Sequence, residues 1–115
     1  MRVAIFSETY WPMVSGVAAT LRRLADALHE RGHAVRVYSA TYRLPEGVPD
    51  RPEVHRSPSK AFFVSPEVQW AFPRYPEIVA DLRAFRPDVV HLATEFAMGY
   101  PGLRAAGELQ LPLIA

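Results

Sequence analysis

The stretch that decides the fold is residues 2–38, RVAIFSETYWPMVSGVAATLRRLADALHERGHAVRVY. It opens with an apolar run, Arg2 to Ser7, of the kind that forms a strand buried on both faces of a parallel sheet. A polar turn with a proline follows from Glu8 to Ser15. Apolar residues then recur at helical spacing, and a second apolar run, Ala34 to Tyr38, returns as a strand. This order predicts a βαβ unit.

The helix of this unit has recognisable ends. Ser15 is placed to cap its first turn, and Gly32 is placed to end it in the left-handed conformation. One face of the helix is apolar and formed by Val17, Leu21, Leu24, Ala25 and Leu28. The spacing therefore predicts an amphipathic helix that packs on the two strands.

Strands and helices continue to alternate in the rest of the chain. The proline-rich stretch from Thr41 to Pro76 has no clear period, and short strands are expected in it near Val54 to Arg56 and Ala61 to Val64. Helices are predicted at Tyr75 to Phe85 and Leu103 to Leu109, and strands at Asp88 to Leu92 and from Pro112 onward. The alternation indicates an α/β, Rossmann-like, doubly wound fold with a mainly parallel sheet.

Length and composition limit the possibilities. The 115 residues, half of them hydrophobic, fit one domain. The net charge of +1 argues against a nucleic-acid partner. The absence of cysteine excludes disulfides and cysteine-ligated zinc, and no spacing of carboxylates or histidines indicates a metal. Neither a signal peptide nor a membrane-spanning run is visible, so a cytoplasmic protein is expected.

Common catalytic and nucleotide-binding fingerprints are missing. The dinucleotide pattern G-x-G-x-x-G and the phosphate-loop pattern G-x-x-x-x-G-K-[ST] do not occur. H-E-x-x-H and G-x-S-x-G are absent as well. Dehydrogenases, P-loop nucleotidases, zinc proteases and serine hydrolases are therefore disfavoured.

The fold nevertheless predicts where a ligand binds. In open α/β sheets the ligand lies beyond the carboxyl ends of the strands, which selects Ser7 to Gly16, Ser39 to Tyr42 and Ala93 to Gly99. Gly16 opens the first helix, where unpaired N–H groups favour an anion and a missing Cβ lets a phosphate approach the backbone. The alternative is that Gly16 only eases the turn from strand to helix.

Several segments resemble one family in the same order and spacing. They are RVAIFSETYWPMVSGV at 2–17, LADAL at 24–28, RGHAV at 31–35 and PDVVHLATE at 87–95, followed by Gly99 and LRAA at 103–106. Together they resemble the N-terminal domain of the retaining, GT-B fold glycosyltransferases of the group 1, or family 4, type. The Ala-Thr-Glu version at 93–95 looks most like the α-mannosyltransferase and sulfoquinovosyltransferase-like branches.

The resemblance implies a function for this end of the sheet. In that family the N-terminal domain supplies the acceptor site, and a C-terminal domain binds the nucleotide sugar. The nucleotide sugar is a co-substrate, and no cofactor is expected. Residues 1–115 are then a partial acceptor-side domain, and the C-terminal domain and the catalytic histidine are expected beyond Ala115. Alone, the chain is expected to transfer no sugar. Self-association of the chain through exposed sheet edges is a further, open possibility.

Individual residues receive roles from the same resemblance. Ser15, Gly16 and Val17 are expected to face the donor diphosphate and sugar, with Ser15 either contributing a hydroxyl or only capping the helix. Contacts to the acceptor or the sugar are expected from Thr9, Tyr10, Thr94 and Glu95, although Glu95 is alternatively a solvated loop charge. His33 and His91 are expected to be structural, and His91 to be buried and hydrogen-bonded.

Two alternatives stay open at the level of sequence. The aromatic residues Phe62, Phe63, Trp70, Phe72 and Tyr75 form an acceptor platform, a peripheral contact with the inner membrane face, or simply a second apolar cluster beneath a loop. The whole chain is alternatively a stand-alone, flavodoxin-like module that binds a phosphate-bearing ligand at Gly16.

Overall fold

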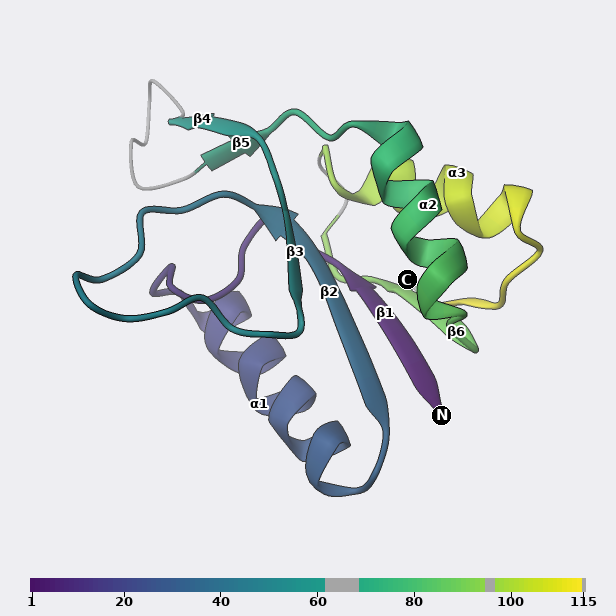
Figure 1. Cartoon of the computed structure of the whole chain (residues 1–115), viewed down its shortest axis with the longest axis horizontal. Helices are drawn as coiled ribbons and strands as arrows, with labels where there is room; N and C mark the ends of the chain where they lie inside the picture. Colours follow the sequence, from purple (N-terminus) through teal and green to yellow (C-terminus); the bar gives the residue numbers. More distant parts are fainter. Residues whose placement is uncertain (62–68, 95–96, 115) are drawn as a thin grey trace.

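A five-stranded parallel sheet forms the centre of the computed structural model, which describes residues 1–61, 69–94 and 97–114 (Figure 1). The strand order is β3-β2-β1-β6-β7, and every neighbouring pair runs parallel. The strands are β1 (Arg2–Phe6), β2 (Ala34–Ala40), β3 (Val54–Ser57), β6 (Val89–Leu92) and β7 (Leu113–Ile114). A separate antiparallel ribbon pairs β4 (Ser59–Ala61) with β5 (Gln69–Ala71). The predicted Rossmann-like α/β fold is confirmed.

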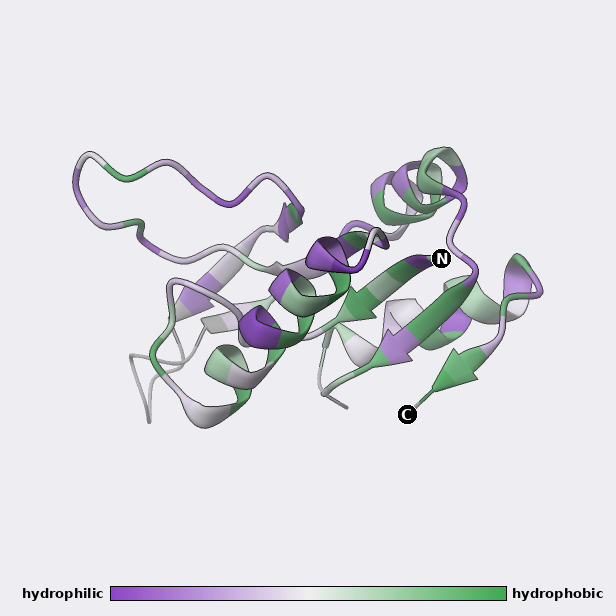
Figure 2. Cartoon of the chain, turned by 90° about the horizontal axis from the view of Figure 1, so that it is seen from below, coloured by the Kyte–Doolittle hydropathy of each residue, from purple (hydrophilic) through white to green (hydrophobic). Residues whose placement is uncertain are grey.

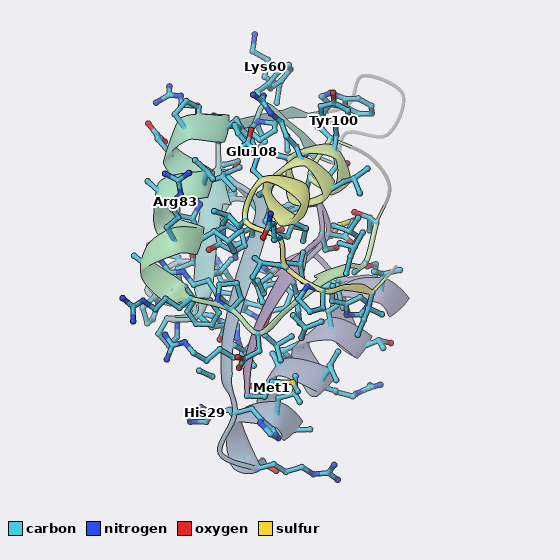
Figure 3. All side chains as sticks on the ribbon, turned by 90° about the vertical axis from the view of Figure 1, so that its right-hand side faces the viewer. Met1, His29, Lys60, Arg83, Tyr100 and Glu108 are labelled. Carbon is cyan, nitrogen blue, oxygen red and sulfur yellow. The ribbon has the colours of Figure 1, made fainter. Side chains whose placement is uncertain are left out.

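In the described ranges, three helices cover the two faces of the sheet: α1 (Gly16–Glu30), α2 (Tyr75–Phe85) and α3 (Gly99–Glu108). Alternation along β1 explains the two layers, because successive side chains point to opposite faces. Val3 and Ile5 pack in a cluster with Leu21 of α1. Ala4 and Phe6 pack instead in the cluster that contains residues of α2 and α3. In side view, α1 and α2 lie on opposite sides of the strands (Figure 3).

The predicted helix ends are confirmed in the first and second helices. Oγ of Ser15 accepts a hydrogen bond of 3.1 Å from the N–H of Ala18, so it caps α1. Gly32 follows α1 with a φ of +84°, a conformation that glycine adopts without the steric cost of a Cβ. Pro76 lies in the first turn of α2, where its missing N–H costs nothing. Ile78 and Leu82 of α2 are buried, as its spacing predicts.

Two elements are longer than the sequence predicts. Strand β2 continues past Tyr38 because Ser39 and Ala40 are fully buried and pair with Arg56 and Ser57 of β3. Helix α3 begins at Gly99, before Leu103, and so includes glycines that the sequence pattern assigns to a turn. Gly102 allows close packing, since a Cβ there would lie 2.6 Å from Cδ2 of Leu92.

The predictions for β3 and β6 match to within one residue. β3 ends one residue later than expected and β6 begins one residue later, at Val89. β4 ends at Ala61, and the rest of the strand predicted up to Val64 lies outside the described residues. No helix in the described ranges has the length and apolar character that crossing a membrane requires.

Figure 2 shows the apolar strands of the sheet from below, with β7 at one edge next to the C-terminus. Leu113 and Ile114 of β7 are 40% and 53% exposed. Within the described ranges, the outer edge of β7 has no neighbouring strand.

Candidate functional site

The carboxyl ends of three neighbouring strands meet at one edge of the sheet. The N–H of Ala93, just after β6, donates a 2.9 Å hydrogen bond to the carbonyl of Phe6 in β1. The N–H of Ser7 donates a 3.0 Å bond to the carbonyl of Tyr38 in β2. All three segments that the fold rule selects are thus brought together.

The loop that connects β1 to α1 is anchored at several points. Oη of Tyr42 donates to the carbonyl of Glu8 at 2.7 Å and approaches Sδ of Met13 at 3.4 Å. The guanidinium of Arg56 donates to the carbonyl of Trp11 and forms a 2.9 Å ion pair with Asp50. The hydrogen bond from Arg56 lowers the pKa of Asp50 below its usual value. These contacts fix the loop while leaving its last residues exposed.

The start of α1 presents unpaired donors. Ser15 satisfies two amides of the first turn: its Oγ accepts from Ala18 and its carbonyl accepts from Ala19 at 3.0 Å. The N–H groups of Gly16 and Val17 have no hydrogen-bond partner in the part of the chain that the structure describes. Exposed N–H groups at a helix start attract an anion, an effect of about 0.3–1 kcal/mol at the surface.

Gly16 and Val17 line a groove between α1 and β6. The groove is open to solvent and has a volume of about 610 Å³. Its lining residues come from the first two turns of α1 and the carboxyl end of β6: Gly16, Val17, Thr20, Leu21, His91, Leu92 and Ala93. A Cβ on Gly16 would meet no atom within 4 Å, so the space in front of this glycine is open. The groove can therefore hold an anionic group against the helix start.

The expected donor-facing residues differ in what they offer. Gly16 and Val17 line the groove, whereas Ser15 lines a neighbouring hollow of about 250 Å³ with Trp11 and Arg22. Because Oγ of Ser15 accepts the N–H of Ala18, its role in this structure is that of a helix cap. Its hydroxyl hydrogen remains available to donate.

Thr94 is held by the backbone of the first loop. Its Oγ1 accepts a 3.2 Å hydrogen bond from the N–H of Glu8. The hydroxyl of Thr94 therefore uses one of its lone pairs on the protein, and its hydrogen is available for a ligand oxygen. The position expected for Glu95 lies outside the described residues.

Tyr10 is buried and Thr9 is half-buried, whereas a contact with a sugar needs an exposed side chain. Tyr10 has no exposed surface and packs with Leu21 and Val37. Its Oη lies 3.5 Å from Oε2 of Glu53. Burial, together with the charge of Glu53, raises the pKa of Tyr10. Thr9 is half-buried, and its backbone N–H and carbonyl both bond to Oγ of Ser7. In this conformation the ring of Tyr10 belongs to the core and has no surface to offer a sugar.

His91 lies in the groove, although the sequence predicts a purely structural role for it. It is half-buried, so the expectation of a buried histidine is wrong. The alternation along β6 is the signal that would have found it. Val89 and Ala93 pack in the cluster on the α1 side of the sheet, and His91 lies between them at the same period of two.

Other parts of the described chain offer little to a ligand. No group of three or more histidine, aspartate or glutamate side chains within these ranges is placed to hold a metal ion. A hollow of about 200 Å³ lies near the other end of α1, beside Asp26, Arg51 and Glu53. Arg51 forms ion pairs with both of these acids, so its guanidinium is already engaged and is not available to an anionic ligand.

Comparison of the sequence with known proteins shows which family it matches. Residues 14–115 match the sequence model described as Glycosyltransferase Family 4. A GDP-mannose-dependent alpha-mannosyltransferase from Mycolicibacterium smegmatis is 40% identical over 121 residues, which cover 100% of this chain and 32% of that protein. An alpha-monoglucosyldiacylglycerol synthase from Streptococcus pneumoniae is 33% identical over 114 residues, which cover 99% of this chain and 26% of that protein.

A second mannosyltransferase extends the pattern. The GDP-mannose-dependent alpha-mannosyltransferase from Mycobacterium tuberculosis is 36% identical over 123 residues, covering 100% of this chain and 31% of that protein. The chain thus spans between a quarter and a third of the length of these relatives.

Proposed function

Since this chain belongs to glycosyltransferase family 4, we propose that it forms the N-terminal, acceptor-side part of a retaining transferase that moves a hexose from a nucleotide sugar to a lipid or glycan acceptor. The proposal is carried by the N–H groups of Gly16 and Val17, two residues that line the groove beside β6 and whose amides have no partner among the described residues. Mannose or glucose is the transferred sugar, by analogy with the names of the relatives.

The groove binds the nucleotide sugar through the negative charge of its diphosphate. A nucleoside diphosphate gains negative charge as the sugar leaves. Hydrogen-bond donors that are already in position stabilise that charge better than water does. The N-terminus of α1 supplies such donors. His91 lies in the same groove, so it adds a donor on the opposite wall. The base and the remaining phosphate contacts are assigned to a C-terminal domain outside this chain, and no metal is assigned to these residues.

The acceptor side is assigned to the segment after β6. Thr94, with its hydroxyl hydrogen available, and Glu95 are proposed to contact hydroxyl groups of the acceptor or the sugar, with Thr9 at the neighbouring loop. Tyr10 is not retained among these contacts because its side chain is buried.

A lipid acceptor is consistent with the apolar surface near this end of the molecule. Trp70, Phe72, Tyr100 and Leu103 are between 40% and 73% exposed. Tyr100 and Lys60 lie at the end of the molecule opposite Met1 and His29 (Figure 3). Aromatic side chains flanked by basic ones suit the interface of an anionic membrane. Co-sedimentation with anionic vesicles tests this peripheral contact, and protein that stays in the supernatant removes it.

The exposed edge at β7 bears on how the chain behaves in isolation. Leu113 and Ile114 leave apolar surface at that edge, and open strand edges promote pairing between molecules. We expect the isolated chain to associate with itself and to transfer no sugar. Light scattering that gives a clean monomer would contradict the first expectation, and turnover by the purified chain would contradict the second.

The decisive experiment is a Gly16→Ala substitution in the complete gene product, assayed with GDP-mannose and UDP-glucose. Gly16 has open space for the new methyl group, so the fold is retained while the methyl blocks the approach of a phosphate. We expect kcat/KM to fall about tenfold, equivalent to about 1.4 kcal/mol of lost stabilisation.

The matched control is Gly107→Ala, because Gly107 is also a helical glycine whose added Cβ would meet no atom within 4 Å. It lies in α3, away from the groove, and is expected to leave transfer unchanged. Binding of a phosphate-bearing ligand at Gly16 without any sugar transfer by the complete gene product would favour the stand-alone binding module instead.

A further inference from the structure

The guanidinium of Arg56, in β3, is a charged group that the proposed function does not use. Its side chain is 13% exposed, and it donates four hydrogen bonds. Two of them go to the carboxylate of Asp50, from Nε at 3.0 Å and from Nη2 at 2.9 Å. Nη1 donates to the carbonyl of Ala40 at 3.0 Å, and Nη2 also donates to the carbonyl of Trp11. One planar group therefore joins β3 to the end of β2, to the connection between β2 and β3, and to the loop between β1 and α1.

The pairing of Arg56 with Asp50 serves orientation more than stability. Taking two charges out of water costs free energy that their attraction offsets only in part, and apolar side chains of similar volume often stabilise a fold as well. The rigid fork of a guanidinium, by contrast, fixes the directions of several acceptors at once. The carboxylate of Asp50 is itself held by the N–H of Arg51 at 2.9 Å. Arg56 therefore sets the position of the Trp11 carbonyl relative to the ends of β2 and β3.

The loop between β1 and α1 depends on this contact because its last residues are loosely packed. Residues 11–15 border the hollow of about 250 Å³ beside α1, so open space lies on that side of the loop. Val14 is 99% exposed. The polar contacts of the stretch include the N–H of Met13, which donates to the carbonyl of Tyr10 at 3.0 Å, and Oη of Tyr42, which approaches Sδ of Met13. Hydrogen bonds more than apolar burial thus fix its path, and such segments open easily when an anchor is lost.

This path leads from Trp11 directly to the cap of α1. Ser15 has an extended backbone, with φ of −157° and ψ of 164°. In that conformation its Oγ accepts the N–H of Ala18 and its carbonyl accepts the N–H of Ala19. A loop that moves at Trp11 loosens this cap, and the two preceding amides, which are proposed to bind the diphosphate, then lose their fixed direction.

We propose that Arg56 is a positioning residue: paired with Asp50, it holds the carbonyl of Trp11 and so keeps the first amides of α1 in place for the diphosphate of the nucleotide sugar. The role in donor binding rests on the proposed function, whereas the anchoring of the loop does not. The described residues that line the groove do not include Arg56 or Asp50, so both act through the loop. The connection between β2 and β3 thereby contributes to a site that it does not touch.

The test is Arg56→Lys in the complete gene product, with Arg36→Lys as the matched control. Lysine keeps the charge beside Asp50 but lacks the fork that reaches the two carbonyls. Arg36 also binds one carboxylate through two N–H groups, but its partner, Asp81, lies in α2. The control therefore loses a comparable pairing on the face of the sheet opposite α1.

Hydrogen exchange measures the anchoring of the loop. We expect the amides of Met13, Ala18 and Ala19 to exchange at least about tenfold faster in Arg56→Lys, because the loss of a charge-assisted hydrogen bond lets the loop and the cap open more often. Arg36→Lys should leave these amides unchanged. Unchanged exchange in Arg56→Lys, or equal acceleration in the two variants, overturns the anchoring whether or not the protein transfers sugar.

Kinetics separate positioning from a purely structural role. With GDP-mannose or UDP-glucose as the donor, Arg56→Lys should lower kcat/KM for the nucleotide sugar severalfold and leave KM for the acceptor unchanged. Arg36→Lys should change neither, even where it lowers stability. Faster exchange with an unchanged kcat/KM for the nucleotide sugar overturns the positioning role. If no transfer is found at all, the proposed function fails while the exchange result still decides the anchoring.

A second variant covers the case in which Arg56→Lys does not fold. Asp50→Asn keeps Arg56 but removes the charge that orients its guanidinium. It should cause the same changes in exchange and in kcat/KM, to a smaller extent. Asp50→Asn that behaves as wild type in both measurements overturns the proposal.

Discussion

Oη of Tyr38 donates a 2.7 Å hydrogen bond to Oδ2 of Asp81, which joins β2 to α2 across the larger apolar cluster. The same carboxylate accepts two bonds from Arg36, of 2.9 Å and 2.7 Å. Tyr38 is fully buried, and its ring stacks on Phe6 with 4.6 Å between the centroids. The hydrogen bonds of Asp81 therefore hold α2 against strand β2 of the sheet.

Tyr38→Phe should lower the free energy of unfolding by about 1.5–3 kcal/mol, the usual contribution of a hydrogen bond to a charged group. The stacking on Phe6 is kept, so the change isolates the hydroxyl. Urea denaturation of the purified chain measures it. Glu77→Gln is the control, because the Arg74–Glu77 pair is 3.6 Å long and exposed, and such pairs contribute little. Equal losses in the two variants would contradict the prediction.

The same network predicts a loss of stability in acid. Burial acts to raise the pKa of Asp81, but the hydrogen bonds from Arg36 and Tyr38 outweigh it and hold the pKa below its usual value of 3.8. A carboxyl whose folded pKa is depressed stabilises the fold above the unfolded pKa, and that stability is lost as the pH falls through the folded pKa. The free energy of unfolding should therefore drop below about pH 4. In Asp81→Asn the decline should be shallower; a curve with the wild-type slope would show that Asp81 does not contribute.

Glu8 should show the opposite dependence on pH. Burial raises the folded pKa of Glu8 above its usual value of 4.5, so the folded state holds the proton more tightly than the unfolded state does. Stability is then lost as the pH rises from that value through the folded pKa, and it stays lower above it. Glu8→Gln has no charge to desolvate, so its free energy of unfolding relative to wild type should increase over this window. Denaturation of both proteins from about pH 4 to about pH 8 checks the sign. A difference that is constant with pH would contradict it.

Most of the fold was predictable because its signals are local. The apolar run at 2–7, the spacing of α1, its Ser15 cap and Gly32 all act within a few residues of one another, so periodicity and capping rules identify them. The start of α3 was not predictable in this way. Gly99 and Gly102 look like turn residues in sequence, and only the close approach of Thr94 and Leu92 in space explains them.

The candidate site shows the same division. The rule on carboxyl strand ends correctly brought the three segments together, and Gly16 and Val17 do line a groove. The burial of Tyr10 and the place of His91 in the groove were not predictable, because they depend on which face of the sheet or loop each side chain takes. The burial of Glu8 depends on Ser39, Tyr42 and Thr94, which bond to its backbone from segments far away in sequence. No pattern within the loop could reveal it.

Two glycines of α3 should respond in opposite ways to the same substitution. A Cβ at Gly102 would lie 2.6 Å from Cδ2 of Leu92 and 2.7 Å from Cγ of Phe6. Both neighbours are part of the packed face of the sheet, so they cannot yield without moving other core side chains. We expect Gly102→Ala to lower the free energy of unfolding by about 1–3 kcal/mol through overpacking.

Gly107→Ala should instead raise the free energy of unfolding, by about 0.5–1 kcal/mol, because alanine restricts the unfolded chain and meets no atom within 4 Å in the helix. Since both changes add one methyl group to the same helix, differences in helix propensity cancel between them. Urea denaturation of the two variants then isolates the packing of α3 on Phe6 and Leu92. If Gly102→Ala proved as stable as Gly107→Ala, the close approach of α3 to the sheet would be wrong, and with it the position of the segment that carries Thr94.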